Sequence, residues 1–227
     1  MKKIAFGLLF LISFVASAQS LPEGFVYLSN IDASIQKELR YESTNNFIGK
    51  PINGYHKDVV IVSKKTALAL QKIQQIFLKD SLSLKIFDAY RPQQAVDHFV
   101  KWAKDLKDTL RKQDFYPSVP KSELFAQGYI ASKSGHTRGS TVDLTLVHVK
   151  TNQELDMGSP YDFFGKASHP FYKGITKVQQ KNRLLLRTVM LKNGFQPYEN
   201  EWWHFEPIIG PGWKCPPLVK DATFTID

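Results

Sequence analysis

The chain has 227 residues, a formal net charge of +9 and a single cysteine, Cys215. One cysteine excludes an internal disulfide and a cysteine-rich metal site. The basic balance is compatible with anionic cell-envelope polymers nearby, but no stripe of basic residues with interleaved aromatics indicates nucleic-acid binding. A chain of this length can bury one full hydrophobic core, so we expect a single globular domain.

Residues 1–18 have the pattern of a secretory signal peptide. Two lysines precede an apolar run over residues 4–15, and "ASA" at 16–18 supplies the small residues of a cleavage site. The apolar run is shorter than the roughly 20 residues that a membrane span requires. We therefore predict cleavage before Gln19, a mature domain over residues 19–227, and a periplasmic or secreted location.

The mature chain alternates helical and strand-like patterns. In chain order it predicts a helix over 63–80, a strand over 83–90, a helix over 92–108, a loop over 118–131, a strand over 140–149, a helix over 176–194 and a strand over 201–206. The candidate helix-end residues are Ser63, Pro92, Thr176 and Gly194. No regular strand–helix–strand rhythm is present, which favours an α+β domain with a mainly antiparallel sheet and flanking helices.

The strand at 140–149 carries a candidate metal ligand. Apolar residues alternate there with Thr141, Asp143 and Thr145, which share the polar face. His136 precedes this strand, and a tight turn or hairpin between them would bring its imidazole close to the Asp143 carboxylate. With His204 from "EWWHF", these residues supply three nitrogen and oxygen ligands, which suit a catalytic zinc that keeps one position open for water.

Two further residues have candidate catalytic roles. On a straight strand Glu201 and His204 would point to opposite faces, so we place Glu201 on the turn before the strand, beside the metal. There its carboxylate would act as a general base rather than as a ligand. Arg91, restricted by the proline that follows it, would stabilise the oxyanion of a tetrahedral intermediate.

Two motifs resemble the signatures of the VanX-like zinc D-alanyl-D-alanine dipeptidases. The stretch "SGHTRGSTVD" at 134–143 is similar to Ser-x-His-x-x-Gly-x-Ala-x-Asp, and "EWWHF" at 201–205 is similar to the family's Glu-x-x-His with paired tryptophans. Further similarity covers 40–55, 88–96 and 156–165. Thr141 replaces the signature alanine, and we expect it to narrow the pocket or to add a hydroxyl near the metal.

The resemblance implies a D,D-peptidase-like zinc fold and one zinc ion per chain, held by His136, Asp143 and His204. It implies Glu201 as the general base and Arg91 as the group that stabilises the transition state. It also implies a small closed pocket for a D,D-dipeptide, with lining residues Ser134, Asp162, Tyr41 and Tyr55. Asp162 would pair with the substrate ammonium, because a buried cation needs a carboxylate nearby.

The leading functional hypothesis is hydrolysis of D-Ala-D-Ala to two D-alanines in turnover of cell-wall dipeptide. The alternative within the same fold is a zinc D,D-carboxypeptidase that trims peptidoglycan stem peptides. These differ in pocket closure, because a dipeptidase must capture a free amino terminus whereas a carboxypeptidase leaves that side open. A non-catalytic wall-binding domain that retains the zinc fold is a third possibility.

Overall fold

The computed structural model describes residues 21–209, so the predicted signal peptide and Cys215 lie outside the described residues. Its strands are β1 (Phe25–Tyr27), β2 (Gln36–Lys37), β3 (Ile61–Ser63), β4 (Leu82–Asp88), β5 (Val142–His148), β6 (Phe195–Tyr198) and β7 (Glu201–Pro207). Its α-helices are α1 (Lys64–Leu78), α2 (Gln93–Lys104), α3 (Lys112–Phe115) and α4 (Lys177–Lys192). Short 3-10 helices include η2 (Arg40–Glu42) and η4 (Gly135–Arg138).

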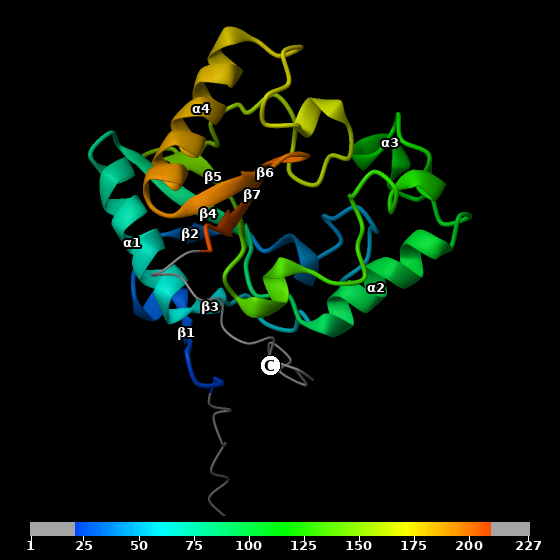
Figure 1. Ribbon diagram of the computed structural model, residues 1–227, viewed down its shortest axis with the longest axis horizontal. Coiled ribbons are helices and arrows are strands. Elements are labelled where there is room, and N and C mark those ends of the chain that lie inside the picture. Colours follow the sequence, from blue (N-terminus) through cyan, green and yellow to red (C-terminus); the bar gives the residue numbers. More distant parts are fainter. Residues whose placement is uncertain (1–20, 210–227) are drawn as a thin grey trace, which may run out of the picture.

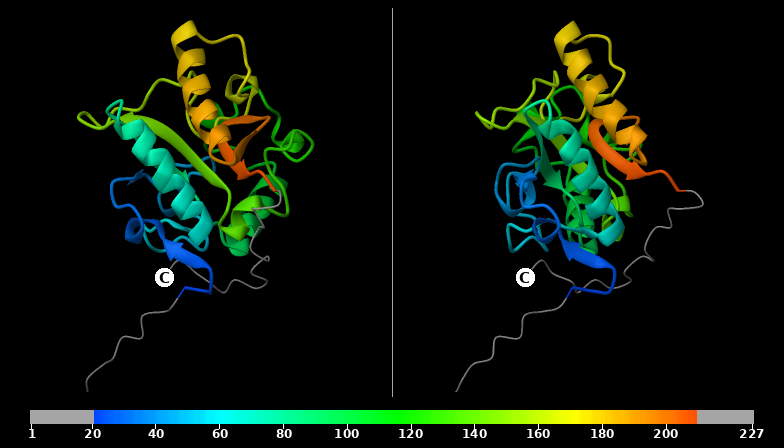
Figure 2. Two further views of the ribbon diagram at one scale, coloured as in Figure 1. Left: turned by 60° about the vertical axis from the view of Figure 1, so that its left-hand side comes forward. Right: turned by 90° about the vertical axis from the view of Figure 1, so that its left-hand side faces the viewer.

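A five-stranded sheet in the order β2-β4-β5-β7-β6 forms the centre of the molecule. The β2–β4 pair is parallel, and the other neighbours in this sheet are antiparallel. Helices α1 and α4 lie on one side of the sheet, and α2 and α3 lie on the other (Figures 1 and 2). The predicted α+β architecture, a mainly antiparallel sheet flanked by helices, is confirmed.

Local signals placed two helices correctly. The Ser63 hydroxyl caps α1 by accepting a hydrogen bond from the backbone N–H of Thr66. Helix α4 begins with a capping box, in which Thr176 and Gln179 each bond the other's backbone. Such reciprocal bonds satisfy amide groups that have no partner within the helix. Gly194 follows α4 with φ of 89°, as its predicted place at the C-terminal stop requires.

Helix α2 is shorter than the pattern predicted. It ends at Lys104 rather than near residue 108, because Asp105 leaves the helical conformation with φ −82° and ψ 88°. The Asp105 carboxylate then accepts a hydrogen bond from the backbone N–H of Lys107. An aspartate that bonds nearby backbone in this way offers the chain an alternative to the helix.

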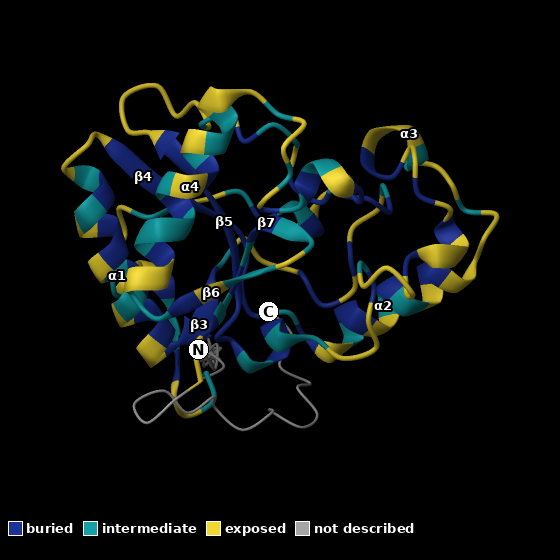
Figure 3. Cartoon of the chain, turned by 45° about the horizontal axis from the view of Figure 1, so that its top comes forward, coloured by how far each residue is buried: buried dark blue, intermediate teal, exposed yellow. Residues whose placement is uncertain are grey.

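The two central strands β4 and β5 are buried along nearly all of their length (Figure 3). Strand β5 was predicted to have one polar face, yet Asp143 and Thr145 on that face are 2 % and 0 % exposed. The polar alternation of β5 therefore faces the protein interior, where Asp143 belongs to the site described below. Among residues 21–209, we find no helix long and apolar enough to cross a bilayer.

Candidate active site

A row of polar residues crosses three neighbouring strands of the sheet. Asp88 at the end of β4 is the register partner of Asp143 in β5, and Asp143 is the partner of His204 in β7. Residues paired across strands have side chains on the same face and close together. The sheet register therefore brings together groups that lie far apart in the sequence.

His136 reaches this row from η4, immediately before β5. The predicted hairpin between His136 and Asp143 is wrong, because a 3-10 turn joins them and β5 pairs with β4 and β7 instead. The turn ends at Gly139 with φ of 63°, where a Cβ would lie 2.4 Å from the Phe25 ring. Only glycine fits this left-handed, crowded position. The predicted tight turn at Gly139 is therefore present.

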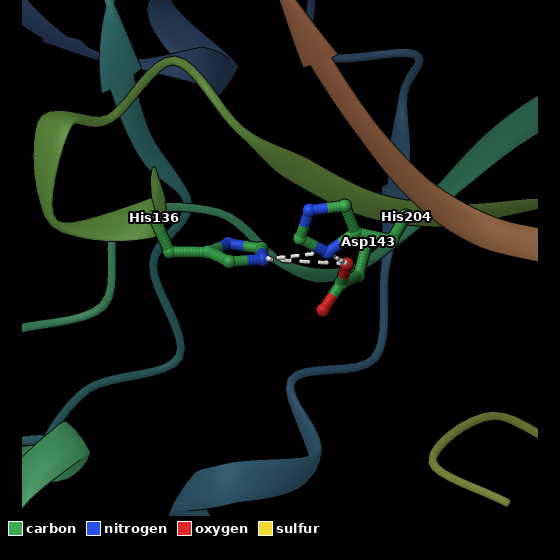
Figure 4. A group of neighbouring side chains, drawn as sticks. All are labelled: His136, Asp143 and His204. Carbon is green, nitrogen blue, oxygen red and sulfur yellow. Dashed lines mark hydrogen bonds and ion pairs between the residues drawn. The ribbon is translucent and has the colours of Figure 1, made fainter. Parts of the chain in front are cut away.

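Three ligand atoms converge at one point (Figure 4). Asp143 Oδ1 lies 3.0 Å from His204 Nδ1 and 3.3 Å from His136 Nε2, and the two imidazole nitrogens are 3.3 Å apart. Ligands at about 2.0–2.1 Å in a tetrahedral zinc site are separated by roughly 3.3 Å. Asp143 Oδ1 is also buried without a hydrogen-bond partner among the described residues. The donor set therefore fits zinc.

Outer partners fix which nitrogen of each histidine faces this point. His136 Nδ1 lies 2.8 Å from the carbonyl oxygen of Ala89, which can only accept, so Nε2 carries the free lone pair. His204 Nε2 lies 3.5 Å from Glu206 Oε1, which leaves Nδ1 toward the cluster. Partners of this kind orient metal-binding histidines and set their tautomers.

The carboxyl group of Asp143 is ionised in this setting. Burial opposes its charge, but the imidazoles of His136 and His204 hold the pKa of Asp143 well below its usual range. For His204 burial opposes the imidazolium, yet the adjacent carboxylates of Asp143 and Glu206 raise its pKa to about 10. The three residues therefore form a strongly interacting group that a divalent cation would hold together.

Glu201 is the first residue of β7, so its predicted place on the preceding turn is wrong. Its Oε2 nevertheless lies 3.5 Å from His204 Nδ1. The β6–β7 register shifts, from Pro197 opposite Phe205 to Tyr198 opposite Glu201. The irregular strand segment breaks the alternation of faces, so residues three apart can approach the same point.

The Glu201 carboxyl can gain and lose a proton near neutral pH, as a general base must. Burial raises its pKa to about 7, although the neighbouring His204 charge favours the carboxylate. Proton transfer is most effective when the pKa of the catalytic group lies near the working pH. Glu201 can therefore both accept and return a proton beside the ligand cluster.

Arg91 is held rigidly beside the cluster. Its Nε donates to Asp88 Oδ2 at 2.8 Å, and its Nη2 lies 3.4 Å from Asp143 Oδ2. The guanidinium also stacks 5.3 Å from the centre of the Tyr41 ring and 5.2 Å from that of Phe99. Among the described residues its Nη1 has no hydrogen-bond partner, so this nitrogen is available to a ligand.

A cavity of about 210 Å³ joins these groups to Asp162. The Asp162 carboxyl accepts a hydrogen bond from the Tyr41 hydroxyl at 3.1 Å, whereas its Oδ2 is buried without a partner among residues 21–209. Burial raises the pKa of Asp162 well above its usual range, and the negative charge of Asp143 adds to this. A cationic group of a ligand would satisfy this carboxylate. The cavity residues that bear on the chemistry are Arg91, Ser134, His136, Asp162, Glu201 and His204.

Ser134 and Tyr41 line the cavity as predicted, but Tyr55 does not. The Tyr55 hydroxyl donates to Asp88 Oδ1 at 2.7 Å, behind the site. Asp88 is fully buried and its Oδ2 lies 3.6 Å from His136 Nδ1. Tyr55 therefore supports the carboxylate that holds Arg91 and packs edge-on against Tyr41, without lining the cavity itself.

Thr141 also lies elsewhere than expected. It is 1 % exposed and does not line the cavity. A Cβ on Gly135 would lie 2.6 Å from Thr141 Oγ1, so the threonine hydroxyl packs directly against the Gly135 backbone. Thr141 thus supports the turn that carries His136, and neither narrows the pocket nor adds a hydroxyl to it.

Sequence reasoning missed two buried residues of the site. Neither Asp88 nor Tyr161 was predicted to belong to the site. The Tyr161 hydroxyl lies 3.0 Å from Asp143 Oδ2 and 3.0 Å from the Tyr41 hydroxyl, so it links the metal end to the Asp162 end. Asp88 lies in the stretch "DAYRP" and Tyr161 lies in "SPYDFF", but the contacts of both residues depend on long-range packing. The only sequence signal for either residue is its position inside a stretch that resembles the family.

Comparison with known proteins gives a consistent result. A family model described as D-ala-D-ala dipeptidase matches residues 22–215. The D-alanyl-D-alanine dipeptidase of Enterococcus faecalis is 40 % identical over 84 % of this chain and 95 % of that protein. The D-alanyl-D-alanine dipeptidase of Enterococcus faecium is 36 % identical over 80 % of this chain and 90 % of its own.

Among solved structures, similarity is found to a crystal structure of the vancomycin resistance D,D-pentapeptidase VanY, a point mutant in complex with Zn(II). That match has a TM-score of 0.41 and 13 % identity, and covers 68 % of this chain and 77 % of that chain.

Proposed function

This chain belongs to the D-Ala-D-Ala dipeptidase family of peptidases, and from that membership we propose that it hydrolyses D-Ala-D-Ala to two molecules of D-alanine. The observation that carries the proposal is one cavity that joins the His-Asp-His cluster and Glu201 to Asp162, whose Oδ2 is buried without a hydrogen-bond partner among residues 21–209. A dipeptide has a cationic amino group close to its scissile bond, and this cavity offers a partner for each.

The reaction adds one water across the peptide bond. His136, Asp143 and His204 would hold zinc, which supplies Lewis acidity to such a site when bound. The Glu201 carboxylate takes a proton from the attacking water and returns it to the leaving amine, so the C–N bond breaks as the second D-alanine departs.

Two cationic contacts orient the substrate during this step. Arg91 Nη1, which has no hydrogen-bond partner among residues 21–209, donates to the carbonyl oxygen as negative charge develops on it, a type of interaction worth about 3–4 kcal/mol. The substrate ammonium pairs with Asp162, whose carboxyl also accepts a hydrogen bond from Tyr41. Because Ser134 Oγ accepts a hydrogen bond from the backbone N–H of His136, its own proton can be donated to the substrate carboxylate.

The proposal is tested by measuring D-alanine release from three substrates by the purified zinc-loaded protein. These are D-Ala-D-Ala, its N-acetyl derivative and a stem pentapeptide ending in D-Ala-D-Ala. Removing the ammonium leaves Asp162 unpaired, so we expect the acetylated dipeptide to react roughly 10²–10³-fold more slowly. Preferential release from the pentapeptide would instead support the alternative, a D,D-carboxypeptidase.

We further propose that the protein is exported and acts on dipeptide released from the cell wall. The support is the signal-peptide pattern of residues 1–18 and the basic charge of the chain. Amino-terminal sequencing of the protein from cell fractions tests this, with Gln19 expected at the start of a periplasmic or secreted form. A cytoplasmic protein that retains Met1 would contradict it.

A further inference from the structure

Two side chains, one at the end of β6 and one in the β6–β7 turn, reach across to the loop at 127–130. Asn200 Nδ2 donates to the carbonyl oxygen of Gln127 at 2.9 Å, and the Tyr198 hydroxyl donates to that of Gly128 at 3.2 Å. The Asn200 amide lies 3.5 Å from the Tyr198 hydroxyl. We call these four residues the clasp. It joins segments that are about 70 residues apart in the chain.

The clasp depends on close approach of the loop backbone. Gly128 has φ of 78°, and a Cβ there would lie 2.7 Å from the Tyr198 hydroxyl oxygen and 3.3 Å from Asn200 Nδ2. Glycine is the residue that tolerates both the left-handed conformation and the missing space. Tyr198 and Asn200 can therefore form hydrogen bonds directly with the loop backbone.

The loop at 127–130 forms a wall of the cavity near Asp162. Gly128, Tyr129 and Ile130 line the cavity. The Tyr129 ring stacks on Phe164 at 5.0 Å, and Phe164 stands two residues after Asp162 in the same segment. The loop thus lies over the side where a substrate amino terminus would pair with Asp162.

The two side chains of the clasp belong to the β6–β7 hairpin, which also carries Glu201. Asn200 immediately precedes Glu201, and Tyr198 lines the cavity. We propose that the clasp determines substrate length: it holds the loop at 127–130 against the β6–β7 hairpin and closes the cavity beyond Asp162. This inference rests on the proposed function. A peptide extended at its amino end would have to displace the loop, whereas a dipeptide would not.

Breaking the clasp should raise activity toward longer peptides relative to the dipeptide. The test compares kcat/KM for L-Lys-D-Ala-D-Ala with that for D-Ala-D-Ala in wild type, Asn200→Ala and Tyr198→Phe, all zinc-loaded. We expect each variant to raise the tripeptide-to-dipeptide ratio by about fivefold, the factor for one hydrogen bond. The dipeptide should remain the better substrate, since Asp162 still favours an ammonium on the residue whose carbonyl is attacked.

Asn182→Ala is a matched control. Its side-chain amide also donates to a distant backbone carbonyl, that of Asp156, at 2.9 Å, but it does not line the cavity. It should leave the ratio unchanged. A general loss of stability would lower both activities, so a change in the ratio separates a specificity role from a structural one.

Amide hydrogen exchange gives a second readout, and we expect faster exchange over residues 127–131 in Asn200→Ala than in wild type. A wild-type protein active on the dipeptide, with the same ratio in both clasp variants, would overturn the inference alone. Equal wild-type activity on both peptides would overturn it as well. A wild type inactive toward D-Ala-D-Ala would instead overturn the proposed function.

Discussion

The two ends of the cavity are built on different principles. At the metal end, Asp143 and His204 stand on paired strands, and outer hydrogen bonds orient both histidines. At the other end, Asp162 lies on a loop with φ of 62°, and one of its carboxylate oxygens is buried without a partner among the described residues. Strand pairing and these hydrogen bonds position the groups of the metal end. At the Asp162 end, burial disfavours the charge of the carboxyl group, which a substrate cation would stabilise.

The sharpest test of the metal end is removal of a ligand. His136→Ala should abolish stoichiometric zinc binding and activity together, because two ligands and open solvent cannot reproduce the three-ligand site. Metal analysis after dialysis and an assay of D-alanine release measure both. His148→Ala, which removes an exposed imidazole at the end of β5, should change neither. Zinc retained at full stoichiometry in His136→Ala would remove His136 from the ligand set.

Glu201→Ala should separate catalysis from metal binding. We expect activity to fall by about 10²–10⁴-fold, as for loss of a general base, while zinc content stays at one ion per chain. Glu199→Ala removes an exposed carboxylate two residues earlier and should behave as wild type. Near-normal turnover by Glu201→Ala would show that another group accepts the proton.

Asp162→Asn should lower activity and raise stability. Asparagine tolerates the left-handed backbone and keeps the shape, but it cannot neutralise the ammonium, so we expect kcat/KM for D-Ala-D-Ala to fall by roughly 10²–10³-fold. The folded-state pKa of Asp162 is raised, so the folded state holds this proton more tightly than the unfolded state. Stability from this group therefore decreases as pH rises through that pKa.

The variant should accordingly have a higher melting temperature than wild type at neutral pH, without ligand. The difference should shrink as pH falls and Asp162 becomes protonated in both folded and unfolded protein. Thermal unfolding at several pH values measures this. A variant that is less stable than wild type at neutral pH would show that the Asp162 carboxyl already has favourable partners in the free protein. That result would contradict the proposed difference between the two ends of the cavity.

The pH dependence of kcat/KM reports on Glu201 at the metal end. Its carboxylate form is required to accept a proton, and burial raises its pKa to about 7 in the metal-free protein. A bound divalent cation favours the carboxylate, so the acid limb should lie at or below pH 7 with a slope of about tenfold per pH unit. An acid limb well above pH 7 in the zinc-loaded enzyme would contradict this assignment.

The smallest effects are expected from two tyrosine hydroxyls that support the carboxyl groups of the site. Tyr55→Phe removes one hydrogen bond to Asp88 and should cost about 1 kcal/mol of stability, with little change in KM. Tyr41→Phe removes the bond to Asp162 inside the cavity and should raise KM for the dipeptide more strongly. Steady-state kinetics and denaturant unfolding of both variants measure the difference. A larger increase in KM from Tyr55→Phe than from Tyr41→Phe would show that Tyr55 contributes to the substrate pocket, as predicted from the sequence.

Local patterns predicted much of the framework. Ser63 and Thr176 cap the helices that follow them, and the strands that carry Asp143 and His204 were placed correctly. Caps and side-chain periods act over a few residues, so one sequence reveals them. The family signatures likewise indicated the residues of the metal cluster, which the structure brings together.

What the sequence by itself determined is thus the order of elements and the chemical groups available: two imidazoles, an aspartate, a candidate base and an arginine. Tertiary structure alone decided that Asp88 and Tyr161 join the site, that Tyr55 and Thr141 stay outside the cavity, and that Glu201 begins a strand. These outcomes depend on strand register and on packing between distant segments. Register pairs residues through non-local contacts, whose partners a local pattern does not specify.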